Sequence, residues 1–425
     1  MAPQSMSRLA SIYSFCVLGL MVMPHQIYGS SRGSLALTSG ISDHPPADGI
    51  CATLVTIHGY KCQEHEVVTE DGYILSVQRI PGGRVGVGGN GDTKRQPVLI
   101  QHGVLVDGVT WLLNQPEQNL PTILADQGFD VWISNTRGTR FSNRHLSLQV
   151  NQQGYWNWSW DELAKFDLPA VFDYVYNETG QKIHYVGHSQ GTLIAMAALS
   201  EGLLVEKIKS AALLSPVAYL NTVTSILGVD SYLINPTCFQ QVANLFGDSA
   251  FDPKGQLLPF FNIARTLCDA PGIDCYGLLA PLTGPNCCLN VSTFHPFIRN
   301  EPQPTSMMNI RHCGQSIREK VVAKYDYGSS EANTARYGEA KAPAYNLSNI
   351  PKNLPLFLSY GALDTLSDVR DVNLLLGILK PNHDVDKLTI QYINNYAHMD
   401  FIMGVNAKDV VYSQVLSFFK NHTGF

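Results

Sequence analysis

The stretch at 182–200, which reads KIHYVGHSQGTLIAMAALS, decides the expected fold. It opens with a short apolar run over 183–186, typical of a buried strand, and ends with an apolar helix over 193–199. Between them stands the pentapeptide GHSQG, whose two glycines let the chain turn sharply. This strand–turn–helix setting predicts a nucleophile elbow that exposes Ser189. A tight turn with a purely structural role is the alternative.

Apolar runs of strand length recur on both sides of this stretch. They cover 97–100, 129–134, 211–214, 355–359 and 388–392. Helix-like segments separate most of them, so the pattern predicts an α/β fold with a mostly parallel central sheet covered on both faces. A hairpin is expected over 64–80, because Glu70-Asp71-Gly72 is a turn signal between two short strands.

The alternation of strands and helices breaks between residues 217 and 346. This segment is rich in Pro, Phe and Leu and holds six cysteines: Cys238, Cys268, Cys275, Cys287, Cys288 and Cys313. We therefore expect a core built from 31–216 and 347–425, with 217–346 as an insertion that caps the sheet. Cys287 and Cys288 are adjacent, a spacing unlike that of a zinc site, so no metal is expected.

The N-terminus predicts entry into the secretory pathway. An apolar run of 15 residues, 9–23, follows Arg8 and precedes the small residues Gly29, Ser30 and Ser31, as in a signal peptide over 1–30. A buried N-terminal helix is the alternative. Eight cysteines remain after removal of Cys16, an even number that permits disulfides in about 105 connectivities. Five N-x-S/T sequons support the same route, at Asn157, Asn177, Asn290, Asn346 and Asn421.

Composition excludes several classes of protein. The 425 residues include 29 basic and 35 acidic side chains, a balance without the basic footprint of a nucleic-acid binder. The 45% of hydrophobic residues is enough for a large core and argues against disorder. After residue 30 no apolar run reaches the ~18 residues of a transmembrane helix. What remains is a soluble globular chain, whose oligomeric state the sequence leaves open.

A serine nucleophile needs a base and an orienting carboxylate, and two loops can supply them. In an elbow-type fold these residues follow the serine in the order acid, then histidine. Asp364 comes just after the strand expected at 355–359, and His398 follows the strand at 388–392. Because ligands bind at the carboxyl ends of parallel strands, we expect Ser189, Asp364 and His398 to converge there.

Other residues near these loops are weaker candidates for the two roles. Asp368 and Asp371 lie where the next helix starts, a place that favours acids for helix stability, and Asp400 is expected to hold its own loop. His102, His188 and His295 all precede Asp364, against the required order.

The oxyanion formed during attack requires backbone N–H donors. One donor should be Gln190, the residue after the nucleophile, and the other should come from the loop after the strand at 97–100. That loop reads His102-Gly103-Val104-Leu105, and we assign the second donor to Val104. An ordinary loop glycine is the alternative interpretation of Gly103.

The motifs taken together resemble the acid lipase family, which includes gastric and lysosomal acid lipases, insect relatives and plant triacylglycerol lipases. The resemblance rests on QHGVL (101–105), DVWISNTRGTRFS (130–142), WDELAKFDLPAVFDYV (160–175), KIHYVGHSQGT (182–192), GALDTLSD (361–368) and YAHMDFI (396–402). Its hairpin EVVTEDGYILSVQRIP (66–81) is similar to the family's N-terminal signature. Two departures are HGVL in place of HGLL and GALD in place of GGKD.

The resemblance implies an α/β-hydrolase with a helical cap and lid that cleaves carboxylic esters, chiefly acylglycerols, without a cofactor. It carries the triad onto Ser189, Asp364 and His398, and the oxyanion hole onto Val104 and Gln190. A family disulfide in the cap would map to Cys268 and Cys275, although the spacing differs. The expected partner is neutral lipid at a lipid–water interface, and the expected location is secreted or vacuolar/lysosomal. A short-chain carboxylesterase, a sterol-ester hydrolase and a non-catalytic lipid-binding protein remain alternatives.

Overall fold

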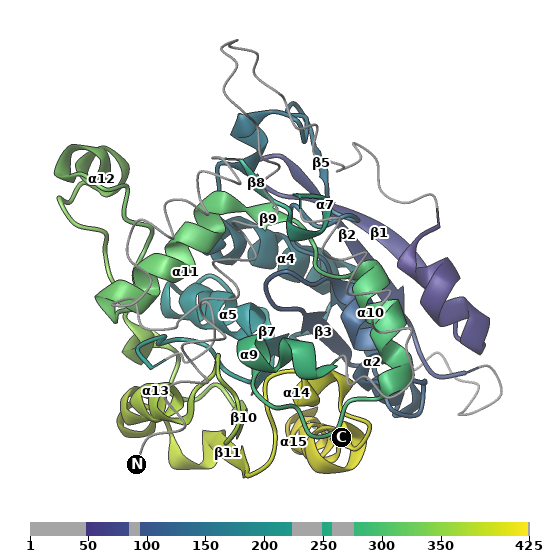
Figure 1. Ribbon diagram of the computed structural model, residues 1–425. Coiled ribbons are helices and arrows are strands. Elements are labelled where there is room, and N and C mark those ends of the chain that lie inside the picture. The colour runs from purple at the N-terminus through teal and green to yellow at the C-terminus, as the bar shows by residue number, and fades with distance from the viewer. Residues whose placement is uncertain (1–47, 85–93, 223–248, 257–275, 424–425) are drawn as a thin grey trace, which may run out of the picture. The chain divides into compact units, whose positions relative to one another are not determined.

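The computed structural model describes residues 48–84, 94–222, 249–256 and 276–423 (Figure 1). The expected signal peptide, 1–30, lies outside these residues, and so do Cys268 and Cys275. Among the described residues, no helix combines the length and the apolar character needed to cross a bilayer.

A large, mostly parallel sheet forms the centre of the fold, as the sequence predicts (Figure 1). Its strands β4, β3, β6, β7, β10 and β11 pair in parallel, while β1 and β2 form the expected antiparallel hairpin at one edge. The order across the sheet is β1 (Gln63–Val68), β2 (Tyr73–Ile80), β4 (Asp130–Ser134), β3 (Pro97–Gln101), β6 (Ile183–His188), β7 (Ile208–Leu214), β10 (Leu356–Gly361) and β11 (Leu388–Ile393), with β5 (Arg144–His145) beside β2.

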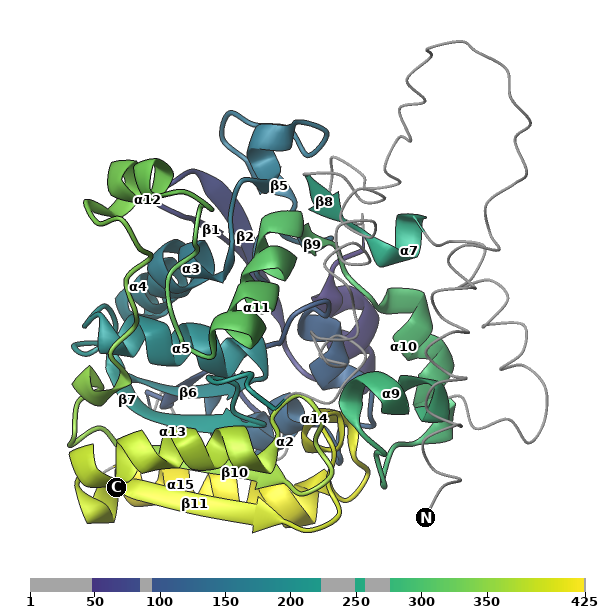
Figure 2. The same cartoon turned by 60° about the vertical axis from the view of Figure 1, so that its left-hand side comes forward.

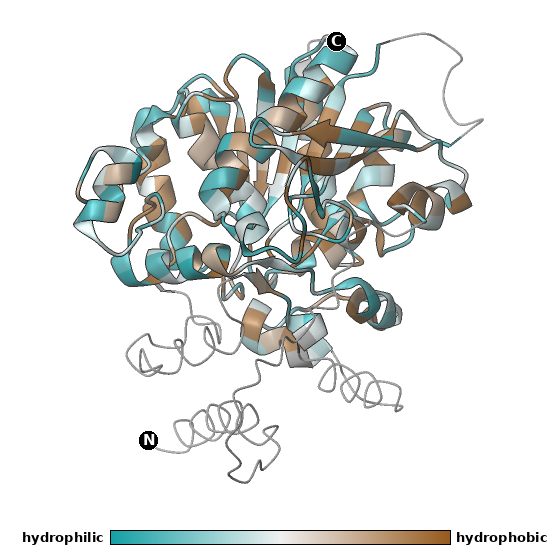
Figure 3. Cartoon of the chain, turned by 90° about the horizontal axis from the view of Figure 1, so that it is seen from above, coloured by the Kyte–Doolittle hydropathy of each residue, from teal (hydrophilic) through white to brown (hydrophobic). Residues whose placement is uncertain are grey.

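Helices cover both faces of this sheet (Figure 2). Along each strand, side chains alternate between two apolar clusters: Leu99 joins the first, whereas Val98 and Ile100 join the second. The first cluster includes α3 (Trp160–Glu162), α4 (Leu168–Thr179), α5 (Gln190–Ser200) and α13 (Val369–Asn382). The second includes α2 (Leu120–Asp126), α14 (Asp400–Met403) and α15 (Ser413–Thr423). Most of the helices drawn in Figure 3 carry both hydrophobic and hydrophilic residues.

The described part of 217–346 contributes to both apolar clusters. Ala250, Val322 and Tyr345 belong to the first cluster, and Phe294 and Phe297 to the second. Its elements are β8 (Ala250–Phe251), α7 (Pro253–Gln256), α9 (Ala280–Thr283), α10 (Phe294–Asn300), β9 (Thr305–Ser306), α11 (Met307–Glu319) and α12 (Ser330–Tyr337). The described part of this stretch therefore packs against apolar clusters on both faces of the sheet.

Two disulfides join described cysteines, Cys51 to Cys62 and Cys287 to its neighbour Cys288, and Cys313 carries a free thiol. The asparagines of the sequons lie at the surface: Asn157, Asn177, Asn346 and Asn421 are exposed, and Asn290 is partly exposed.

Candidate active site

Ser189 stands at the turn between β6 and α5, as the sequence predicts. Its backbone has a φ of 55° and a ψ of −122°, a strained conformation that residues other than glycine rarely adopt. The turn follows directly from a strand that pairs with β3 and β7, so the serine emerges at the carboxyl end of the central strands. The side chain is largely buried, with 7% of the residue exposed.

Glycines make this sharp turn possible because the chain packs against itself. A Cβ atom on Gly187 would lie 2.9 Å from the carbonyl carbon of Gly191. One on Gly191 would lie 2.8 Å from the carbonyl oxygen of Gln101 and 2.9 Å from that of His102. Real Cβ contacts are essentially never so short, and these three atoms belong to the backbone; the Tyr185 ring lies as close to Gly187, at 2.8 Å. The two glycines of GHSQG therefore allow β6, α5 and the end of β3 to pack closely together.

The loop after β3 lies directly against the serine. A Cβ on Gly103 would approach the Ser189 Cβ to 2.8 Å and its Oγ to 3.2 Å. Leu105 in this loop has a φ of 62° and accepts a hydrogen bond of 2.8 Å on its carbonyl from the Gln303 N–H. Within the described chain, the backbone N–H groups of Val104 and Gln190 make no hydrogen bond. The structure thus brings both residues expected to form an oxyanion hole to the elbow.

Asp364 and His398 meet at the carboxyl ends of the neighbouring strands β10 and β11. The His398 Nδ1 lies 2.9 Å from one Asp364 carboxylate oxygen and 3.1 Å from the other. The Asp364 Oδ1 also accepts the backbone N–H groups of Leu366, at 2.9 Å, and Ser367, at 2.8 Å. Burial raises the pKa of the Asp364 carboxyl, but His398 and these two N–H groups outweigh it and hold the pKa below its ordinary value.

The charge of Asp364 fixes the orientation of the histidine. A carboxylate can only accept hydrogen bonds, so the Nδ1 of His398 donates and its Nε2 is left as the basic atom. His188, the residue before Ser189, links the elbow to the same loop, because its Nε2 donates to the His398 carbonyl at 2.9 Å. The two imidazole rings lie 4.6 Å apart. Elbow and histidine loop are therefore held side by side.

The competing residues have other partners. Asp368 caps α13 by accepting the Arg370 N–H at 2.8 Å, and Asp371 accepts the Thr222 N–H at 2.9 Å. The His102 Nδ1 lies 2.7 Å from the Gly103 carbonyl, and its Nε2 accepts the Thr136 N–H at 3.1 Å. Asp400 accepts the Ala397 N–H at 2.8 Å, so it holds its own loop as expected.

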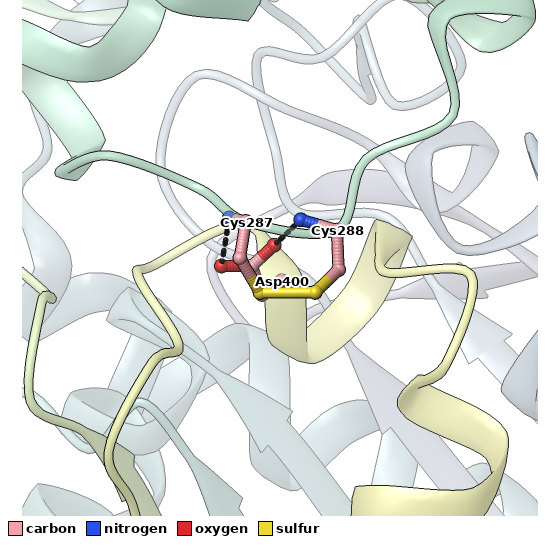
Figure 4. Close-up of side chains that lie close together, drawn as sticks. All are labelled: Cys287, Cys288 and Asp400. Carbon is pink, nitrogen blue, oxygen red and sulfur yellow. Dashed lines mark hydrogen bonds between the residues drawn. A yellow bond between two sulfur atoms is a disulfide. The ribbon is translucent and has the colours of Figure 1, made fainter.

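The sequence did not predict two features around the site. The Gln190 side chain donates to the Asn309 Oδ1 at 3.1 Å and thereby ties α5 to α11 of the inserted stretch. Asp400 also binds the cysteine pair: the ligand atoms of Cys287, Cys288 and Asp400 all lie within 4.8 Å of one another (Figure 4). The disulfide joins the two sulfurs, which are therefore not thiolate ligands for a metal. The adjacent cysteines were visible in the sequence, but their partner acid was not.

Comparisons with known proteins agree with this arrangement. A family model described as "alpha/beta hydrolase fold" matches residues 96–402, and one described as "partial alpha/beta-hydrolase lipase region" matches 51–115. Triacylglycerol lipase 2 of Arabidopsis thaliana is 55% identical over 92% of each chain. Triacylglycerol lipase 1 of the same plant is 36% identical over 97% of each chain. Human gastric triacylglycerol lipase is 34% identical, covering 94% of this chain and 96% of its own.

The matched models and relatives span nearly all of the described chain, including the elbow and most of the inserted stretch. On these matches and on the fold, the chain belongs to the acid lipase family of serine ester hydrolases within the α/β-hydrolase fold.

Proposed function

We propose that this protein hydrolyses the ester bonds of triacylglycerols or related neutral lipids through an acyl-enzyme. The observation that carries the proposal is the Asp364–His398 hydrogen bond beside the elbow of Ser189. The proposed nucleophile is Ser189, the general base is His398, and Asp364 orients the imidazole and stabilises its charged form.

In the first half-reaction, His398 takes the hydroxyl proton of Ser189 on Nε2 while Oγ attacks the ester carbonyl. His398 then gives this proton to the leaving alcohol, which leaves an acyl group on the serine. In the second half, His398 takes a proton from water as the water oxygen attacks the acyl carbon. His398 then returns this proton to the Ser189 Oγ while the acyl–oxygen bond breaks and a fatty acid departs. Asp364 remains ionised throughout, which its lowered pKa supports.

The proposed oxyanion hole consists of the backbone N–H groups of Val104 and Gln190. Their lack of partners within the described chain and the contact of Gly103 with Ser189 support this assignment. Each such donor typically lowers the barrier by about 3 kcal/mol. The valine at 104 does not alter this role, because the donor is a backbone group.

Neutral lipid as the substrate rests on the three relatives reported above, each of which bears the name triacylglycerol lipase. We further propose that 217–346 caps the substrate site and that 1–30 is a signal peptide that directs the chain to the secretory pathway. The two disulfides and the surface positions of the sequon asparagines support the latter.

The test compares the wild type with Ser189→Ala on tributyrin at concentrations below and above its solubility limit. We expect turnover to rise sharply when droplets form and to fall at least about 10⁴-fold in the variant. Ser200→Ala, at the other end of α5, is the matched control and should retain activity. Hydrolysis that survives in Ser189→Ala would overturn the mechanism.

Other outcomes separate the alternatives. A hydrolysis rate that saturates smoothly with tributyrin concentration below the solubility limit identifies a short-chain esterase. A preference for cholesteryl oleate over triolein identifies a sterol-ester hydrolase. A protein that neither hydrolyses any ester in the series nor reacts with an organophosphonate at Ser189 is a binding protein.

A further inference from the structure

A short segment of the inserted stretch, 282–289, lies against the loops of both Asp364 and His398. The Thr365 hydroxyl, next to Asp364, donates to the Leu282 carbonyl at 3.1 Å. The backbone N–H of His398 itself donates to the Thr283 carbonyl at 3.0 Å. Residues more than 80 positions away in the sequence therefore fix the backbone on which the acid and the base are carried.

Gly284 makes the closest of these contacts. Its φ of 85° is in the left-handed region, and a Cβ there would lie 2.0 Å from the Leu363 carbonyl oxygen and 3.1 Å from the Ala397 Cβ. Leu363 and Ala397 are the residues immediately before Asp364 and His398. The backbone of the segment thus touches both loops one residue away from the functional side chains.

Asp400 holds the far side of the His398 turn to the same segment. Its Oδ2 accepts the N–H of Ala397 at 2.8 Å. The same oxygen accepts the N–H of Cys287 at 3.1 Å, and Oδ1 accepts the N–H of Cys288 at 3.0 Å (Figure 4). The carboxyl group is completely buried. Three backbone donors offset the cost of removing it from water.

The cysteine pair shapes the part of the segment that Asp400 contacts. The bond between the neighbouring Cys287 and Cys288 closes a small covalent ring, which limits how their two N–H groups can turn. The segment is bound on both sides of this ring. The Asn286 Oδ1 accepts the Met399 N–H at 3.0 Å, and the Cys288 carbonyl accepts the Val405 N–H at 2.8 Å.

We propose that Asp400 is a positioning residue for the hydrolytic reaction, acting with the Cys287–Cys288 ring to hold the His398 turn so that the imidazole stays on Asp364. This inference rests on the proposed function. Asp400 does not touch substrate. It fixes the backbone on one side of His398, while Asp364 fixes the ring on the other.

The experiment measures kcat and KM of Asp400→Asn with a soluble p-nitrophenyl ester, together with its thermal midpoint. The amide keeps the shape of the side chain but replaces one of the two acceptor oxygens that the three N–H groups use. We expect kcat to fall about 10- to 100-fold with KM nearly unchanged, because small misplacements of a catalytic group have effects of this size.

Asp130→Asn is the matched control. Asp130 is also buried and accepts two hydrogen bonds of 2.9 Å from the Arg79 guanidinium, but it lies at the amino end of β4, at the opposite edge of the sheet from the His398 turn. It should lower stability without changing kcat. A role of Asp400 in stability alone would give the same result in both variants.

The double variant Cys287→Ser with Cys288→Ser opens the ring and leaves Asp400 in place. It should lower kcat by at least about 3-fold, in the direction of Asp400→Asn, whereas Cys51→Ser with Cys62→Ser should not. If the Asp400→Asn protein folds and keeps the wild-type kcat, the inference is overturned. If that variant does not fold, a wild-type kcat in the double-serine variant overturns the inference instead. Ser189→Ala, measured in parallel, distinguishes failure of this inference from failure of the proposed function. The Ser189→Ala protein keeps its activity only if the proposed function is wrong.

Discussion

The elbow of Ser189 and the turn of His398 reach the same edge of the sheet by different means. The elbow is shaped by Gly187 and Gly191, two positions to either side, and by the end of the adjacent strand β3. The His398 turn depends on Asp364, 34 residues from His398, and on Asn286, 113 residues from its bonding partner Met399. A nucleophile can thus be placed by a local motif, whereas placing its base requires a distant segment to fold onto the core.

The largest expected effect comes from breaking the histidine side alone. Asp364→Asn removes the charge that stabilises the imidazolium and permits the wrong tautomer of His398, so kcat should fall about 10³- to 10⁴-fold. The hydrogen bonds of this carboxylate go to Leu366, Ser367 and His398 and not to the elbow, so the conformation of the elbow should be unchanged. Steady-state kinetics on a soluble ester, with circular dichroism as the check on folding, measures the effect. A loss below 10-fold would contradict the assigned role.

Breaking the elbow alone should act through packing. Gly191→Ala places a Cβ against two backbone carbonyl oxygens, those of Gln101 and His102, neither of which can rotate away. We expect a loss of about 1–3 kcal/mol in the free energy of unfolding, together with reduced kcat. Gly377→Ala in α13 is the control, because a Cβ there would meet no heavy atom within 4 Å beyond its chain neighbours and the backbone of its own helix, and alanine favours helix. Denaturant titrations of both variants give the comparison, and equal midpoints would show that the close approach is unimportant.

The smallest expected effect concerns His188, which belongs to the elbow by sequence and contacts the His398 turn by its hydrogen bond. Burial, with a smaller effect of His398, lowers the pKa of His188 from 6.5 to about 3. In the unfolded chain, His188 therefore takes up a proton near pH 6.5, whereas in the folded chain it takes up this proton only near pH 3. The free energy of unfolding falls as the pH drops through that window, by up to about 1.4 kcal/mol per pH unit.

The variant His188→Gln keeps a donor for the His398 carbonyl but removes the titration. Its unfolding free energy should decline less steeply than that of the wild type between pH 6 and 4, as measured by urea denaturation. Parallel curves for the two proteins would show that His188 is not the source of the acid sensitivity.

The same contrast explains what the sequence could predict. The strand, turn and helix around Ser189 follow from residues adjacent in the chain, and the parallel strands follow from their apolar runs. Strand β6 continues to His188, two residues beyond the predicted end, because Gly187 and His188 still pair with Leu213 and Leu214 of β7. Strand pairing of this kind is decided by the neighbouring strand and not by the local residue types.

The contacts of Asp400 with the cysteine pair could not be predicted from the sequence. A carboxylate that accepts backbone N–H groups leaves no pattern in the sequence, because every residue except proline offers such a donor. The pairing of Cys51 with Cys62 had the same difficulty, since it was one of many equally allowed connections. Asp364 and His398 do lie side by side, and this proximity could be expected because the fold places an acid and then a histidine after the serine.

The contact of Gly284 with Leu363 and Ala397 has a consequence for anyone who exchanges parts between relatives. A chimaera that exchanges residues 282–289 together with the rest of 217–346 would lose these contacts and carry a poorly aligned histidine. A graft should therefore keep 282–289 native, with its junctions upstream of Leu282 or downstream of Leu289, where the bridge to Gly404 ends the contact.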